Sequence, residues 1–139
     1  MYLSRKVRER GWDSERQPDI AALVEEFAEL DYVNDAQFAE ARSRSFVRRG
    51  YGMRRLDEDL RAAKISKNDG QSASEHMAES AFAAAENFAR RKRIGPFAND
   101  IAPPDKQQKQ LQAFLRAGHG FDLARRFVHA QPGAELQEE

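Results

Sequence analysis

Arginine is the residue type with the most evident binding chemistry in this chain, and it is concentrated between residues 42 and 55. No acidic residue occurs between Glu40 and Asp57, whereas this segment contains Arg42, Arg44, Arg48, Arg49, Arg54 and Arg55. A guanidinium group binds carboxylate or phosphate through two parallel hydrogen bonds, so the strip could grip an acidic filament groove or a DNA backbone. Helical spacing puts Arg42 and Arg49 near the apolar stripe, where their stems could cover the core edge. Partner contact is expected of the other four and of Arg49, with a solvated face as the alternative.

A second group of positive charges stands at the expected end of a later helix, and consists of Arg90, Arg91, Lys92 and Arg93. Charges there complement the helix dipole, and the same density is typical of a patch for nucleic acid or an acidic protein. Arg125 and Arg126 form a third candidate, with Asp122 nearby to offset their charge. All of these side chains are therefore predicted partner-binding residues, with a purely structural role as the alternative.

Residues suited to catalysis or metal binding are not found in a recognisable arrangement. The chain has no cysteine and three histidines, none of them in an HExxH or comparable spacing. No glycine-rich segment ends in GK[ST], so a phosphate-binding loop is not indicated. Neighbouring carboxylates, such as those at residues 57–59, are interpreted as solvated helix surfaces. The sequence predicts a protein that is not an enzyme, with no catalytic residue, cofactor or metal.

A short motif that occurs twice indicates how the arginines are positioned. Residues 46–52 read Phe-Val-Arg-Arg-Gly-Tyr-Gly, and residues 114–120 read Phe-Leu-Arg-Ala-Gly-His-Gly. Each copy is typical of a helix end, a Gly-aromatic-Gly corner and the start of another helix. Tyr51 and His119 hold the same place in the two corners, where they could stack on a partner or pack against adjacent helices. A repeated unit of this kind favours a protein that presents a surface rather than one that encloses a reaction.

Apolar residues at helical spacing predict helices along the chain, and no strand is predicted. The expected helices cover residues 3–10, 18–30, 34–50, 53–65, 75–93, 105–117 and 121–130. Residues 31–33 are expected to end the helix at 18–30, and Asn34 is expected to cap the helix that follows. Residues 67–74 are expected to form a polar loop. The prediction is an all-α fold of tandem three-helix repeats in an elongated, curved array. Its parts are a partial first repeat (1–33), a three-helix repeat (34–93), a third repeat (94–130) and a flexible acidic tail (131–139).

Composition restricts the possible partners. The 139 residues include 23 Lys or Arg and 23 Asp or Glu, so the formal net charge is zero. This balance argues against strong nonspecific affinity for DNA, although it allows a local basic face. No apolar run approaches the roughly 20 residues that cross a bilayer, and no signal peptide is indicated. We expect a monomeric, cytoplasmic protein without a membrane partner.

Several of these segments, taken in order, resemble the RecX family of recombinase regulators. They are residues 3–12, 32–39, 49–56, 60–65 and 115–126. Members of this family are tandem three-helix repeats that bind RecA, the ATP-dependent DNA strand-exchange protein, and usually inhibit its filament growth, ATP hydrolysis and coprotease activity. The resemblance implies a regulator of recombination, DNA repair and the SOS response whose partner is the RecA filament.

Three features depart from the family pattern, and two other functions stay open. The chain begins at what would be the second helix of the first repeat, so that repeat is expected to lack its first helix. Lys64 stands where the family has Gly before Ile, and the neutral charge argues against direct DNA binding as the dominant activity. One alternative is a DNA-binding helical module that contacts single-stranded or double-stranded DNA through the basic patches, although the carboxylates of residues 57–59 would repel phosphates. The other is a general protein-interaction adaptor.

Overall fold

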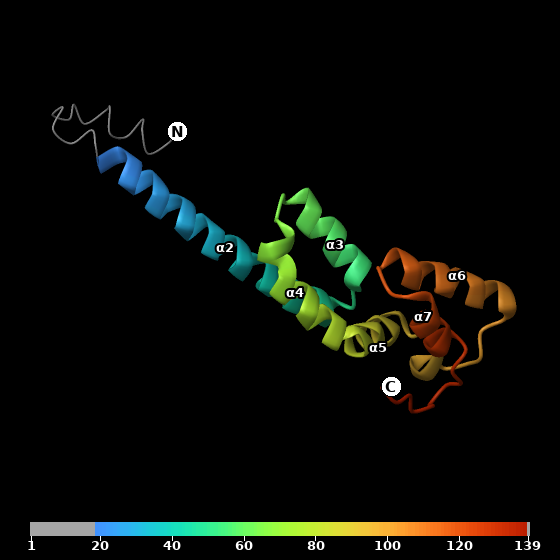
Figure 1. Ribbon diagram of the computed structural model, residues 1–139. Helices are drawn as coiled ribbons and strands as arrows, with labels where there is room; N and C mark the ends of the chain where they lie inside the picture. Colours follow the sequence, from blue (N-terminus) through green and yellow to red (C-terminus); the bar gives the residue numbers. More distant parts are fainter. Residues whose placement is uncertain (1–18, 139) are drawn as a thin grey trace. The chain divides into compact units, whose positions relative to one another are not determined.

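The computed structural model describes the backbone of residues 19–138 and the side chains of residues 34–138. In this part of the chain six α-helices and one 3₁₀ helix follow one another without a strand, so the all-α prediction is confirmed (Figure 1). The elements are α2 (Asp19–Arg49), α3 (Met53–Ala62), α4 (Lys67–Glu79), α5 (Ala81–Lys92), η2 (Gly95–Phe97), α6 (Pro104–Arg116) and α7 (Phe121–Val128). The helix predicted over residues 3–10 lies outside the described residues.

The chain divides into two compact units, Met1–Asp35 and Ala36–Glu139. Every candidate partner-binding residue belongs to the second unit, which is the one described below. None of the described helices is long and apolar enough to span a membrane.

The predicted break at residues 31–33 and the cap at Asn34 are wrong, because α2 is a continuous helix from Asp19 to Arg49. Asp and Asn are weak helix formers, but this segment contains neither Gly nor Pro, so nothing in it forbids a helical backbone.

The polar loop predicted over residues 67–74 is also wrong, because α4 begins at Lys67. The Ser66 hydroxyl accepts a hydrogen bond from the Asp69 backbone N–H at 3.1 Å, which satisfies one of the free donors at the helix start. Ala73 and Met77 are fully buried on one side of the helix, and this packing outweighs the polar composition. The single helix predicted over residues 75–93 is divided at Ser80 into α4 and α5.

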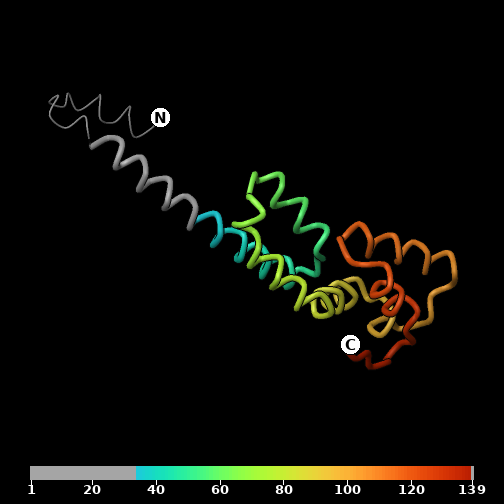
Figure 2. The backbone as a smooth tube through the Cα atoms, in the orientation of Figure 1, coloured from blue at the N-terminus to red at the C-terminus, as the bar shows by residue number. Residues whose placement is uncertain are grey.

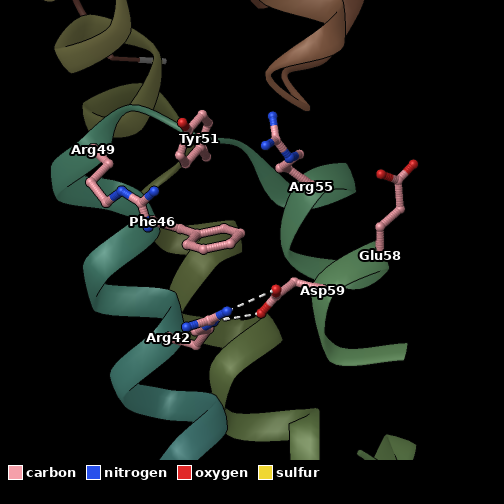
Figure 3. A pocket seen from close by; sticks show the side chains of 7 residues that line it. All are labelled: Arg42, Phe46, Arg49, Tyr51, Arg55, Glu58 and Asp59. Carbon is pink, nitrogen blue, oxygen red and sulfur yellow. Dashed lines mark hydrogen bonds and ion pairs between the residues drawn. The ribbon is translucent and has the colours of Figure 1, made fainter. Parts of the chain in front are cut away.

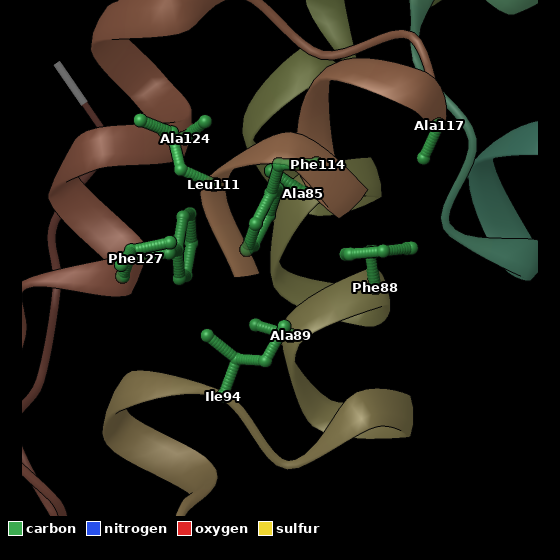
Figure 4. Close-up of a cluster of buried hydrophobic side chains, with 10 residues drawn as sticks. Ala85, Phe88, Ala89, Ile94, Leu111, Phe114, Ala117, Ala124 and Phe127 are labelled. Carbon is green, nitrogen blue, oxygen red and sulfur yellow. The ribbon is translucent and has the colours of Figure 1, made fainter. Parts of the chain in front are cut away.

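Two clusters of buried apolar side chains hold the second unit together. The first joins the end of α2 to α3, α4 and the start of α5, and consists of Ala39, Phe46, Leu56, Leu60, Ala73, Met77 and Ala84. The second joins α5 to α6 and α7, and consists of Ala85, Phe88, Ala89, Ile94, Leu111, Phe114, Ala117, Ala124, Phe127 and Val128 (Figure 4). The backbone folds back between α3 and α4 and between α6 and α7 to close them (Figure 2). Tyr51 is partly buried against both clusters, so it lies where they meet.

The segment predicted as a flexible acidic tail, residues 131–139, contacts neighbouring elements within its described part, residues 131–138. The Gly133 N–H donates to the Pro96 carbonyl at 2.9 Å, and Leu136 packs against the second cluster. These two contacts tie Gly133 and Leu136 to the neighbouring elements.

Four helices end in the same hydrogen-bonding pattern. The residue after a left-handed position donates its N–H to a carbonyl five residues earlier: Tyr51 to Phe46 (2.8 Å), Ile65 to Leu60 (2.9 Å), Ile94 to Ala89 (2.9 Å) and His119 to Phe114 (3.1 Å). The left-handed residue is glycine in the two repeated corners but Lys64 and Arg93, with φ of 61° and 56°, in the other two. Lys64 therefore takes the conformation for which glycine is suited, and its side chain makes that conformation unfavourable.

Replacing Lys64 by glycine is expected to stabilise the protein by about 1 kcal/mol, because glycine adopts positive φ without a Cβ clash. The matched control is Ala63→Gly, one residue earlier, where φ is −80° and glycine only adds flexibility to the unfolded chain. Urea unfolding followed by circular dichroism measures both variants. Equal effects of the two substitutions would contradict the assignment of strain to Lys64.

The two Gly-aromatic-Gly corners lie directly against each other. The Gly52 N–H donates to the Ala117 carbonyl at 2.8 Å, and the Arg54 N–H donates to the Gly118 carbonyl at 3.2 Å. A β-carbon added to Gly118 would lie 2.6 Å from the Arg55 nitrogen, and one added to Gly52 would lie 2.5 Å from the Gly118 oxygen. The repeated motif is therefore an internal joint that fixes the start of α3 against the turn between α6 and α7.

Candidate partner-binding site

Three arginines from three helices surround the ring of Tyr51. Their guanidinium carbons lie 4.6 Å (Arg55), 5.0 Å (Arg49) and 5.5 Å (Arg91) from the ring centroid. These distances are within the range of cation–π attraction. Figure 3 shows Arg49 and Arg55 on either side of the ring, which itself stands edge-on to Phe46 at 5.3 Å. Arginines from two separate segments of the sequence, residues 42–55 and residues 90–93, therefore lie around one ring.

Helix ends explain the position of two of these arginines but not of the third. Arg49 and Arg91 lie in the last turns of α2 and α5, where a cation complements the negative end of the helix dipole. Arg55, with its neighbour Arg54, lies in the first turn of α3, which contains no acidic residue. A cation at this positive end is unfavourable. Arg54 and Arg55 therefore do not serve the stability of α3, which favours a role in binding.

The arginines alter the acidity of the phenol that they surround. Burial alone would raise the pKa of Tyr51, but the charges of Arg49, Arg91 and Arg55, with a hydrogen bond from Arg91, lower it below its ordinary value. A lowered phenol pKa indicates a positive local potential, and such a potential attracts anions.

A hollow of about 370 Å³ opens beside Tyr51, and we call it the Tyr51 hollow (Figure 3). It is lined by Arg42, Phe46, Arg49, Tyr51, Arg55, Glu58 and Asp59. Arg42 donates two parallel hydrogen bonds to the Asp59 carboxylate, from Nε to Oδ2 at 2.6 Å and from Nη2 to Oδ1 at 3.0 Å. The hydrogen bond from Arg42 is the main reason that the pKa of Asp59 is lowered, and the charges of Arg42, Arg49 and Arg55 add to the effect. The hollow already holds one carboxylate in the geometry that arginine prefers.

A second hollow of about 290 Å³ lies on the other side of Arg55, and we call it the Gly118 hollow. It is lined by Arg54, Arg55, Glu58, Leu115, Arg116 and Gly118. Arg55 and Glu58 line both hollows. Arg116 was not predicted from the sequence as a site residue. The signal was available, because Arg116 aligns with Arg48 in the repeated motif.

The remaining predicted residues do not join this site. Arg44 and Arg48 are exposed on α2, and neither of them lines the Tyr51 hollow. Arg90 lies over the Phe97 ring at 4.8 Å and 3.7 Å from a Glu86 carboxylate oxygen. Arg125 lies 5.7 Å from the Phe121 ring centroid, and Arg126 donates to the Gln137 carbonyl. Lys92 and Arg93 are exposed at the end of α5.

His119 is part of the core rather than of the surface. Its side chain is 6% exposed, and its ring packs against Phe88 at 5.6 Å and Phe114 at 5.5 Å. Its Nε2 donates to the Gly50 carbonyl at 2.7 Å, across the joint of the two corners. Packing, the second of the two roles considered for this residue, is confirmed. Burial lowers the pKa of His119, and the hydrogen bond to Gly50 opposes that shift only in part.

The folded protein is expected to lose stability as the pH falls below about 6.5, the ordinary pKa of histidine. Below that pH the unfolded chain binds a proton at His119 more readily than the folded chain, whose His119 has a lowered pKa. The stabilisation is thus present above the unfolded pKa and is lost as the pH decreases. Urea unfolding at about pH 7.5 and about pH 5.5 measures the effect.

The control for this pH dependence is His119→Gln, which keeps an N–H donor toward Gly50 but does not titrate. The decrease in urea midpoint between the two pH values should be smaller in this variant than in the unsubstituted protein. An equal decrease in both proteins would show that His119 is not responsible.

Among the described side chains, no three His, Asp or Glu residues gather as they would around a metal ion. The charged groups of the two hollows are arginines with two carboxylates, Glu58 and Asp59. This arrangement can bind oxyanions through several guanidinium groups at once.

Comparison with known proteins gives two relatives. No family model and no solved structure match the chain. Regulatory protein RecX of Myxococcus xanthus (strain DK1622) is 28% identical over 119 residues, which cover 81% of this chain and 62% of that protein. Regulatory protein RecX of Vibrio parahaemolyticus (serotype O3:K6, strain RIMD 2210633) is 27% identical over 120 residues, 86% of this chain and 74% of that protein. The chain thus spans less than two thirds of the length of the first relative.

Proposed function

From the RecX-family assignment that both relatives support, we propose that this chain regulates RecA. It acts as an inhibitor that docks on the RecA–DNA filament and modulates filament assembly, ATP hydrolysis and strand exchange. It works in the cytoplasm as a monomer and needs no cofactor.

The observation that carries this proposal is the arrangement of Arg49, Arg55 and Arg91 around Tyr51. All three arginines are exposed, and Arg49 and Arg55 form no ion pair with a carboxylate of residues 34–138. Exposed guanidinium groups that converge from three helices provide a preformed surface for acidic groups of a partner. The surface needs no rearrangement of α2, α3 or α5 to be used.

We further propose that residues 34–93 and 94–130 are two related helical repeats, which follow a partial first repeat within residues 1–33. The recurrence of the corner motif and the presence of two buried clusters support this division. α5 contributes to both clusters, so neighbouring repeats share a helix at their junction. Such sharing is expected of repeats that bury a continuous core by stacking.

The DNA-binding module is less well supported than the RecA regulator. In this alternative the corner at residues 50–52 would be the turn of a helix-turn-helix variant, whose second helix inserts its first residues into the major groove. The start of α3 is instead packed against the other corner, because Gly52, just before α3, and Arg54, in its first turn, donate backbone hydrogen bonds to Ala117 and Gly118. The carboxylates of Asp57, Glu58 and Asp59 follow on the same helix. No observation favours this function over the first.

Titration of the purified protein into RecA turning over ATP on single-stranded DNA tests the proposed function. We expect the rate of ATP hydrolysis to fall as the protein is added, and to fall at concentrations comparable to that of RecA. An unchanged rate at a large excess of the protein, with its helical content intact, would contradict the proposal.

A further inference from the structure

The Tyr51 hollow and the Gly118 hollow share two lining residues, Arg55 and Glu58, and their charges are unevenly distributed. Together they are lined by five arginines, Arg42, Arg49, Arg54, Arg55 and Arg116, but by only two carboxylates, Glu58 and Asp59. Asp59 is bound by Arg42 in the Tyr51 hollow, whereas Glu58 lines both hollows. An anionic ligand that enters both hollows therefore meets the Glu58 carboxylate in each of them.

Asp59 shows what kind of group the first hollow accepts. Its carboxylate is held bidentately by Arg42 at 2.6 and 3.0 Å. Arg49 and Arg55 line the same hollow without an ion pair to any carboxylate of residues 34–138. Two arginine forks are thus left over for a second carboxylate, since each fork matches the two oxygens of such a group.

The second hollow offers a comparable set of donors. Arg54 and Arg116 line it together with Arg55, and neither forms an ion pair with a carboxylate of the described side chains. Arg54 and Arg55 belong to the first turn of α3, whose dipole also attracts negative charge. Arg116 reaches the hollow from the end of α6, so the two sides of the hollow come from different helices.

The position of Glu58 distinguishes an acidic protein segment from a nucleic acid. A nucleic-acid strand carries a negative charge at every nucleotide, so a strand that runs through both hollows places phosphates close to Glu58. A peptide can instead carry an uncharged residue at that point and an acidic residue on either side of it. The neutral net charge of the chain also gives little general attraction to DNA.

We infer that the two hollows bind an acidic segment of a partner protein, with one carboxylate in each hollow and an uncharged residue over Glu58. This inference rests on the proposed function, because it takes the two hollows to be the surface that docks on the partner. It adds the chemistry of the partner segment that they bind. Arg55 takes part in both halves of the site, whereas Arg116 serves only the second.

Fluorescence anisotropy with labelled peptides tests the inference. The probes are short serine peptides with two glutamates separated by one to four serines, an all-serine peptide of equal length, and a thymidine oligonucleotide of matched charge. We expect one glutamate spacing to bind better than the others. We expect this binding to weaken at least about fivefold in Arg55→Gln and in Arg116→Gln, and to be unchanged in Arg48→Gln, whose side chain lies outside both hollows.

Two results would overturn the inference. The first is that no glutamate peptide binds better than the all-serine peptide. The second is that the oligonucleotide binds more tightly than every peptide and loses affinity in Arg55→Gln, which would make the surface a nucleic-acid site. With either result, the protein can still lower the rate of ATP hydrolysis in the RecA titration, so the proposed function would stand. Conversely, peptide binding without an effect on RecA would refute the proposed function and leave the acidic-segment site standing.

Discussion

Replacing Gly118 by alanine is expected to destabilise the protein by about 3 kcal/mol or more, because two independent costs coincide at this residue. Its φ is +101°, which disfavours any residue with a β-carbon, and the added carbon would lie 2.6 Å from the Arg55 nitrogen and 2.8 Å from the Arg55 β-carbon. These neighbours belong to the first turn of α3 and cannot move without breaking the joint between the two corners. The free energy of unfolding from urea denaturation measures the loss.

Gly120→Ala is the matched control for this substitution. Gly120 lies two residues further in the same corner, has a φ of −70°, and would place its added β-carbon in open space. Its replacement should change the unfolding free energy by about 0.5 kcal/mol or less. If Gly118→Ala proved as harmless as Gly120→Ala, the two corners would not be packed together as described.

The double charge reversal Arg49→Glu, Arg55→Glu is expected to weaken binding to RecA filaments by at least about tenfold. Loss of even one charge-assisted hydrogen bond in a desolvated contact is worth about 1.5 kcal/mol, which already corresponds to about a tenfold change. The reversed charges would also repel acidic groups of the partner. Co-sedimentation with RecA filaments on single-stranded DNA measures the affinity.

Arg44→Glu, Arg48→Glu is the control for this variant, because it makes the same change in net charge at two exposed residues of α2. This variant should retain its affinity for RecA filaments within about a factor of two, because neither residue lines the Tyr51 hollow or the Gly118 hollow. Equal losses in the two double variants would mean that net charge, rather than the arrangement around Tyr51, governs binding.

Much of the helical fold could be predicted from the sequence, because it follows from patterns within single segments. Amphipathic spacing and the glycine corners predicted α3, α6 and α7 close to their observed bounds. The loop predicted over residues 67–74 was wrong because packing and a helix cap outweighed the local composition. Gly70 and its polar neighbours indicated a loop, yet Ser66 caps a helix there and Ala73 and Met77 bury its inner side.

The candidate site could be predicted only as a list of arginines. Arg49 and Arg91 lie 42 positions apart and were predicted as members of separate patches, although both approach the ring of Tyr51. Their convergence depends on the close packing of the end of α2 against α5: a β-carbon added to Gly50 would lie 2.7 Å from the Phe88 backbone, and Asn87 donates a hydrogen bond to the Val47 carbonyl at 2.9 Å. No pattern within either segment predicts this contact. The joint between Gly52 and Gly118 brings Arg116 into one hollow with Arg54 and Arg55.

The central claim is that the surface around Tyr51 contacts RecA, and site-specific photo-crosslinking tests it most directly. A benzoylphenylalanine at Glu58, which lines both hollows, leaves every arginine in the sequence. The same group at Gln108, an exposed position on α6 away from both hollows, is the control. We predict that irradiation with RecA filaments yields a crosslinked RecA product from position 58 and little from position 108. Equal yields at both positions, or no product from position 58, would contradict the account.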